Sequence, residues 1–166
     1  MNETYVECLV EKKTSGIMKF LKYFLITLAA LLGVGSLLFN IAIGLILAIV
    51  FGVVAYFVSL NSSIEFEYLY VDKQITVDKV LAKTKRKGVA KYDVDKMEIL
   101  APLNSHKLDE YKNRQVKLSD YSSGVESKPE VRYAFYYDGK EKVIVEPSEE
   151  FVKAIYNVAP RKVSTY

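Results

Sequence analysis

The sequence is poor in side chains that form cross-links, bind metals or perform catalysis. Among its 166 residues there is one cysteine, Cys8, one histidine, His106, and no tryptophan. A single cysteine excludes an intramolecular disulfide, and neither residue has companions at the spacing of a metal site. We therefore expect Cys8 to act as an apolar side chain and His106 to be a surface residue in a polar loop. No metal and no cofactor is predicted.

Motifs for catalysis and nucleotide binding are also missing. There is no P-loop, no G-x-G-x-x-G and no H-E-x-x-H, and His106 would have to serve as the base for any nucleophile. Asp93, Asp95 and Glu98 suggest a carboxylate pair, but acidic residues on the wet face of a strand account for them more simply. The sequence predicts a protein that is not an enzyme. Nucleic-acid binding is disfavoured too, because acidic residues are interspersed and the net charge is only +3.

Charge is absent from one long stretch. Residues 23–64 contain no Asp, Glu, Lys or Arg. Roughly 20 apolar residues form a helix that crosses the hydrocarbon core, so this run is nearly twice as long as one span needs. Because tilt absorbs only a modest excess, we predict two membrane spans near 20–37 and 41–60. A tight turn at 36–40 would join them, with Asn40 as its most polar side chain.

A buried helix pair in a soluble protein and a signal peptide both fit this apolar run less well. A soluble protein buries one apolar helix, but two adjoining helices without a charged face would leave much apolar surface exposed. A signal peptide has a shorter apolar region followed by polar sequence, whereas here a second apolar run follows at once. We therefore expect a membrane α-helical hairpin.

Basic residues flank the predicted hairpin on both sides. Lysines occur between Lys12 and Lys22 before it and between Lys73 and Lys87 after it, whereas the turn has no charge. The positive-inside rule then places both termini in the cytoplasm and only the turn outside. The predicted localisation is the cell membrane, with two spans.

Small residues recur every four positions in the second predicted span, at Gly44, Ala48 and Gly52. Ala29 and Gly33 offer a matching face on the first span. Small residues allow helices to approach closely in lipid. This face predicts packing within the hairpin or, alternatively, docking of a second copy or of a partner's membrane helix. Since neither span has an ionisable residue, we expect no ion or proton pathway.

The first 19 residues lead into the hairpin. In "ETYVECLVEKK", Tyr5, Cys8 and Leu9 share one helical stripe, and the charged residues lie mostly elsewhere. The pattern predicts a short amphipathic helix along the inner leaflet or, equally, a frayed polar segment.

Residues 62–166 change to the alternation of strands. In "IEFEYLYV" apolar and acidic residues alternate, and "EVRYAFYYDGKEKVIVE" predicts a hairpin with Asp138-Gly139 as its turn. Ser148 is the natural N-cap of an amphipathic helix that Pro160 ends. About seven short strands and one helix predict an α+β soluble domain. It would be a small antiparallel β-barrel or bent sheet capped by the C-terminal helix.

One charged cluster stands out in this domain. Lys83, Lys85, Arg86 and Lys87 lie in a predicted hairpin tip whose Gly88 suits the turn. A solvated turn is the simplest interpretation. The alternative is contact with anionic lipid headgroups, at about 1 kcal/mol per basic side chain near the surface. Even a weak affinity would orient a domain that is already tethered to the bilayer.

The order of these features resembles that of bacterial pleckstrin-homology-like domains. In "EYLYVDKQITVDKVLAKTKRKGVAKYDVDKMEIL" an aromatic strand, a short turn, a long strand and a basic tip precede an x-D-x-x-I-like segment with Asp95, Met97 and Ile99. The whole chain is also similar to a family of small bacterial membrane proteins of unknown function, which have two spans and such a tail. The shared features are the lead-in, "ITVDKV…KRK" and the closing "APRKV" at 159–163. The resemblance implies a pleckstrin-homology-like fold but no catalytic motif.

These features together predict a non-catalytic interaction module that is anchored in the membrane. Its domain would bind a protein, a peptide or an anionic lipid at the cytoplasmic face. The alternative is an accessory subunit of a larger membrane complex, docked through its membrane helices. The expected partners are the lipid bilayer, a protein or a second copy of the chain. An enzyme built on unrecognised loop residues is a third hypothesis, and a concave site lined by several polar groups would be its structural sign.

Overall fold

The computed structural model describes residues 5–39, 41–127 and 130–164. The chain divides into two compact units. The helical unit comprises Thr14–Ile64 and Leu81–Lys85, and the β unit comprises Met1–Lys13, Glu65–Val80 and Arg86–Tyr166. The β unit therefore begins before the hairpin and not only after it, unlike the predicted domain of residues 62–166.

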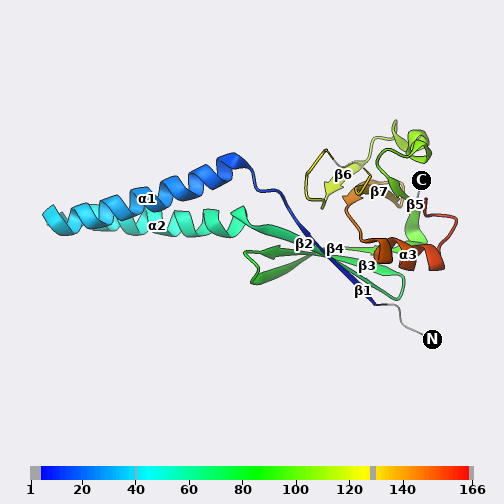
Figure 1. Cartoon of the computed structure of the whole chain (residues 1–166), viewed down its shortest axis with the longest axis horizontal. Helices are drawn as coiled ribbons and strands as arrows, with labels where there is room; N and C mark the ends of the chain where they lie inside the picture. The colour runs from blue at the N-terminus through cyan, green and yellow to red at the C-terminus, as the bar shows by residue number, and fades with distance from the viewer. Residues whose placement is uncertain (1–4, 40, 128–129, 165–166) are drawn as a thin grey trace. The chain divides into compact units, whose positions relative to one another are not determined.

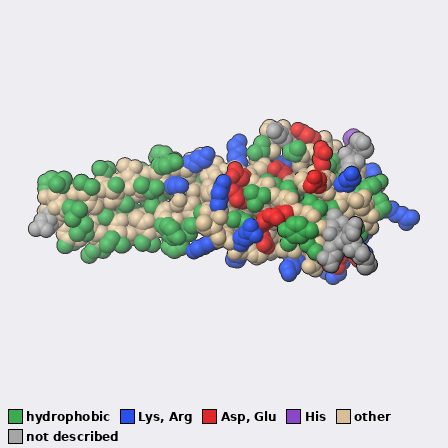
Figure 2. All heavy atoms as spheres, turned by 60° about the horizontal axis from the view of Figure 1, so that its bottom comes forward, with side chains coloured by type: hydrophobic (Ala, Val, Ile, Leu, Met, Phe, Trp, Pro, Cys, Tyr) green, Lys and Arg blue, Asp and Glu red, His purple; other side chains and the backbone are tan. Residues whose placement is uncertain are grey.

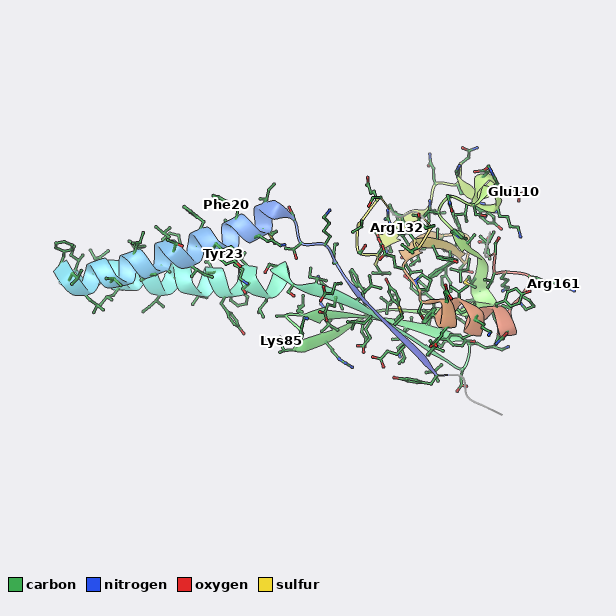
Figure 3. The ribbon with its side chains drawn as sticks, viewed as in Figure 1. Phe20, Tyr23, Lys85, Glu110, Arg132 and Arg161 are labelled. Atoms are coloured by element: carbon green, nitrogen blue, oxygen red, sulfur yellow. The ribbon has the colours of Figure 1, made fainter. Side chains whose placement is uncertain are left out.

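Two long helices form the helical unit, α1 (Gly16–Phe39) and α2 (Ala42–Ser62) (Figure 1). Both are long enough and apolar enough to cross a membrane. Hydrophobic side chains cover their outer surface (Figure 2), among them the exposed rings of Phe20 and Tyr23 on α1 (Figure 3). Only Leu25 and Ser36 are buried in α1 among the described residues. A helix pair with its apolar side chains outside is suited to lipid rather than to water.

The link between the helices is shorter than predicted. α1 remains helical through Ser36 to Phe39, and the Ile41 amide donates to the Ser36 carbonyl. The predicted turn at 36–40 was therefore placed too early, because the glycines beside Ser36 do not break the helix. Asn40 lies outside the described residues.

Four strands form the first sheet, in the order β1 (Val6–Glu11), β2 (Ile64–Val71), β3 (Gln74–Leu81) and β4 (Lys85–Asp93). Asp72 and Lys73 join β2 to β3, and both have positive φ, as a two-residue type I′ turn requires. Ala82 and Lys83 also have positive φ and lie in the turn between β3 and β4. The turn predicted at Gly88 was wrong, since Gly88 lies inside β4.

Residues 6–11 are a strand, so the predicted amphipathic helix and the frayed segment were both wrong. β1 pairs antiparallel with β2, with Val6 opposite Tyr70 and Cys8 opposite Tyr68. The sequence "VECLVE" alternates with period two, and its inward side chains pack on the aromatic residues of β2. Residues 1–4 of the predicted segment lie outside the described residues.

The second sheet has the order β5-β7-β8-β6, with β5 (Met97–Pro102), β6 (Lys117–Asp120), β7 (Tyr133–Tyr137) and β8 (Glu141–Val145). β7 and β8 form the predicted hairpin, and Asp138 and Gly139 both have positive φ in its turn. β6 runs parallel to β8, which departs from the antiparallel prediction. The long connection from β6 to β7 permits this arrangement.

The core of the β unit is aromatic, and α3 (Glu149–Val158) covers part of it. The Ser148 hydroxyl accepts a hydrogen bond from the Phe151 amide at 3.2 Å, as expected of an N-cap. The Phe151 ring lies 6.2 and 6.1 Å from the rings of Tyr68 and Tyr70. Tyr92 and Phe135 connect the two sheets at 5.0 Å. The bent-sheet prediction with a C-terminal helix is thus confirmed, and the two sheets do not close into a barrel.

Candidate functional site

The basic cluster lies at the start of β4 and in the turn before it, where Figure 3 labels Lys85. This turn is attached to the end of α2: the Ala82 amide donates to the Ser63 carbonyl at 2.8 Å. Ser63 is the residue that follows α2, and the bond lies entirely within the helical unit. Lys83 and Lys85 are therefore held beside the end of an apolar helix.

The beginning of the hairpin lies at this same end. The Thr14 hydroxyl donates to the carbonyl of Ser62, the last residue of α2, and α1 begins two residues after Thr14. Lys19 and Lys22 lie in the first two turns of α1. The helical unit thus has a basic collar, which we define as Lys19, Lys22, Lys83 and Lys85. Sequence reasoning missed the collar because it requires contacts between distant segments.

The remaining two members of the predicted cluster belong to the β unit. The Arg86 Nη2 lies 3.2 Å from the Oε1 of Glu67, whose side chain is only 7% exposed. Lys87 follows on β4 and is exposed. The structure therefore divides the predicted cluster: Lys83 and Lys85 join the collar, whereas Arg86 forms an ion pair on the first sheet.

The small residues of α2 differ in what surrounds them. A Cβ atom on Gly44 would overlap the Ser36 hydroxyl of α1, and a Cβ atom on Gly33 would lie 3.8 Å from the Ala48 Cβ. A Cβ atom on Gly52 would meet no described atom within 4 Å. Gly44 and Ala48 thus pack within the hairpin, and Gly52 does not take part in this contact.

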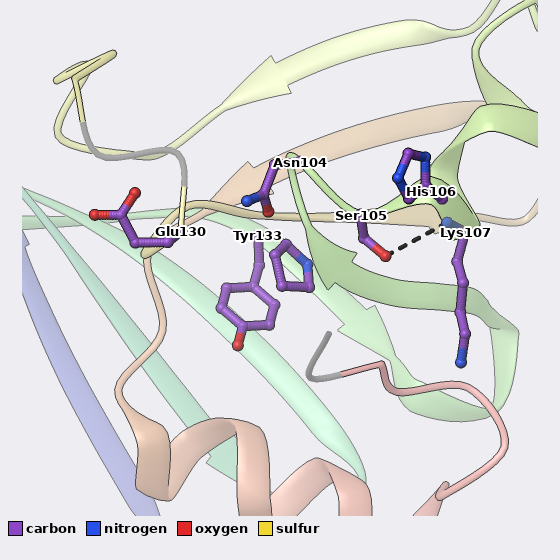
Figure 4. Close-up of a pocket in the computed structure, with 7 residues that line it drawn as sticks. Asn104, Ser105, His106, Lys107, Glu130 and Tyr133 are labelled. Atoms are coloured by element: carbon purple, nitrogen blue, oxygen red, sulfur yellow. Dashed lines mark hydrogen bonds between the residues drawn. The ribbon is translucent and has the colours of Figure 1, made fainter.

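A pocket that the sequence did not indicate lies in the β unit, with a volume of about 410 Å³ (Figure 4). It is lined by Pro102, Asn104, Ser105, His106, Lys107, Glu130 and Tyr133. A second hollow of about 430 Å³ also borders Tyr133, between it and Glu149, Val152, Lys153 and Tyr156 on α3. Burial raises the pKa of the Tyr133 hydroxyl. These surfaces offer an aromatic centre with charged groups of both signs at the rim.

The enzyme hypothesis requires a concave site lined by several polar groups. This pocket has such a lining, but the contacts of its polar side chains have another explanation. The Ser105 hydroxyl accepts a hydrogen bond from the Lys107 amide at 3.4 Å and caps the short helix η2 (His106–Tyr111). The His106 Nδ1 lies 3.4 Å from the Asp109 Oδ2, and its side chain is fully exposed. These are the contacts of a helix cap and of two side chains on the surface rather than of a nucleophile and its base. The described residues contain no group of three or more potential metal ligands.

The family model "Bacterial PH-like domain (DUF6106)" matches residues 2–165. The chain belongs to this family. Its function is unknown, and the match confirms the pleckstrin-homology-like (PH-like) fold that the sequence suggested. Comparisons with curated proteins and with solved structures gave no match.

Proposed function

We propose that this DUF6106 protein is an interaction module anchored in the bilayer by α1 and α2, with its basic collar against anionic lipid headgroups. The hydrogen bond between Ala82 and Ser63 supports this proposal most strongly, because it fixes Lys83 and Lys85 where the apolar surface of α2 ends. The backbone that carries these lysines is thus already positioned, and each lysine contributes about 1 kcal/mol near an anionic surface.

The side of the membrane on which the collar lies is inferred from the same residues. The collar is basic and the link between the helices is not, so the positive-inside rule puts the collar and both termini in the cytoplasm. The β unit would then present its surfaces on the cytoplasmic side. The hollows around Tyr133 are the part of those surfaces best suited to a protein or peptide partner, since their aromatic centre has polar groups at the rim.

The lipid contact can be tested with the full-length protein in nanodiscs. We expect hydrogen exchange of the amides at 81–85 to be slower in discs that contain anionic lipid than in zwitterionic discs, and we expect high salt to remove the difference. Lys83→Gln with Lys85→Gln should also remove it. The matched control is Lys117→Gln with Lys140→Gln, two exposed lysines of the β unit. Equal exchange in both kinds of disc would refute the lipid contact.

An accessory subunit is the second candidate function. It is favoured by Gly52, which has no described atom within 4 Å of its Cβ position and so leaves a smooth site on α2. A partner's membrane helix or a second copy would fit there. Gly52→Leu should then reduce the recovery of the complex from detergent extracts without disturbing α1, and unchanged recovery would count against docking at this site.

A further inference from the structure

The seam between β1 and β2 brings glutamates together on one face of the first sheet. In the antiparallel register Leu9 is opposite Glu67, so Glu7, two residues before Leu9, is a diagonal neighbour of Glu67 on that face. Diagonal neighbours are within reach of each other when their side chains are long. Glu11 and Glu65 are directly opposite each other further along the seam.

Glu67 is buried, with 5% of its surface exposed. Its Oε1 faces the Arg86 guanidinium, but its Oε2 is buried and has no hydrogen-bond partner among the described residues. Glu7 is exposed, and its Oε2 accepts a hydrogen bond from the Tyr5 hydroxyl at 2.9 Å. An ionised carboxylate only accepts hydrogen bonds, whereas a protonated one donates. A proton on either residue would therefore convert the repulsion of two carboxylates into a hydrogen bond.

The charged groups around the pair make one proton the favourable number. Glu7 approaches from β1, Asp78 from β3 and Arg86 from β4. Arg86 balances only one of the three negative charges of Glu7, Glu67 and Asp78, so one carboxylate of the pair gains from being neutral. The Glu7 carboxyl raises the pKa of Glu67, and Glu67 in turn lowers the pKa of Glu7, as expected of two groups that share one proton.

We propose that Glu7 and Glu67 share a proton that holds β1 on the β unit, so that β1 detaches more readily as the pH rises. β1 is the strand that precedes α1, and residues 12–15 alone connect the two elements. Its release would leave α1 attached to the β unit only through α2 and the strands that follow it in the chain. The protonation of this seam thus decides whether the segment before α1 stays paired with β2.

The direction of the pH effect follows from the two pKa shifts. The pKa of Glu67 is raised on folding, so its stabilisation is complete below the unfolded value and is lost as the pH rises through the folded value. The pKa of Glu7 is lowered, so its stabilisation is present above the unfolded value and is lost as the pH falls through the folded value. β1 is therefore held most tightly between the two folded pKa values, on either side of the usual Glu value of about 4.3.

Hydrogen exchange across a pH series tests this proposal on the full-length protein in nanodiscs. Exchange at Val6–Val10, corrected for the intrinsic rate and divided by that of β8, should speed up as the pH rises through the folded pKa of Glu67. Each unit by which that pKa is raised corresponds to about a tenfold change in the opening equilibrium. Glu67→Gln should make the ratio independent of pH.

Two further variants make the outcome decisive. Glu7→Gln lies at an exposed position and should reduce the pH dependence, because it removes the largest cause of the raised pKa of Glu67 and leaves the effect of burial. This variant covers the case in which Glu67→Gln does not fold. Glu98→Gln is the control, because Glu98 pairs with Arg114 on the second sheet and should leave the dependence intact. A wild-type ratio that does not change with pH, or a pH dependence that persists undiminished in both seam variants, would overturn the proposal.

Discussion

The helical unit and the β unit place the same kinds of apolar side chain in opposite positions. In α2 only Ala55 and Ser62 are buried among the described residues, and isoleucines, valines and phenylalanines lie outside. In the β unit Tyr68 and Val77 have no exposed surface at all. The hydrophobic effect drives burial only where water is the solvent, so the first arrangement is stable in lipid and the second in water.

The two units also achieve close contact by different means. The helices approach each other where a side chain is missing, at Gly44 beside Ser36. The sheets are joined by large rings, such as Tyr92 and Phe135. Replacing a large buried side chain by a small one should therefore destabilise the β unit most. Replacing a glycine at the helix contact by a larger residue should destabilise the helical unit most.

The largest expected effect is on the aromatic core. Phe135→Ala should lower the free energy of unfolding of the β unit by about 3–5 kcal/mol, because it leaves a cavity among fully buried neighbours. Denaturant titration followed by near-ultraviolet circular dichroism of the tyrosines measures this loss. Tyr156→Ala, at a ring that is 46% exposed, is the control and should cost much less. Equal losses would mean that Phe135 is not part of the core.

An intermediate effect is expected when a side chain is added between the helices. Gly44→Leu should destabilise the helix pair by about 1–3 kcal/mol, since the new side chain would overlap Ser36. Gly52→Leu adds the same atoms where no described atom lies within 4 Å and should have little effect on the pair. Cysteine cross-linking between α1 and α2 in membranes reports the distance between the two helices. If both variants cross-link as well as the wild type does, the contact at Gly44 is not present in the bilayer.

The smallest effect concerns a helix cap in the β unit. Ser148→Ala removes the acceptor of the Phe151 amide and should cost about 1 kcal/mol. Ser148→Asp keeps an acceptor and should restore most of the stability. Both are measured by the same denaturant titration, and a full loss in the Asp variant would show that the cap hydrogen bond is not the cause.

The features that could be predicted from the sequence are those that depend on residues close to one another along the chain. The absence of charge from 23–64 was enough to predict two helices that are long and apolar enough to cross a membrane. Asp138-Gly139 and Ser148 likewise identified a hairpin and a helix start, since both signals are local. The closing helix followed from these, whereas the PH-like fold was expected from a resemblance to a known family and is confirmed by the family match.

The features that were missed depend on distant partners. Six residues of "VECLVE" fit a helical stripe and a strand about equally, and only pairing with β2, across the whole hairpin, decides between them. The collar depends on the hydrogen bonds of Ala82 with Ser63 and of Thr14 with Ser62, and the proton-sharing pair depends on the register of β1. The periodicity of a sequence does not indicate which distant residues contact each other.

In the proposed topology, α1 and α2 cross the bilayer and leave the collar in the cytoplasm. With Cys8 replaced by serine, a single cysteine at Leu38→Cys or at Lys85→Cys can be probed with a membrane-impermeant maleimide in intact cells. Leu38 lies at the link between the helices and is 75% exposed. We expect the cysteine at position 38 to react in intact cells and the cysteine at position 85 to react only after lysis. Reaction of both in intact cells, or of neither before lysis, would contradict the two spans.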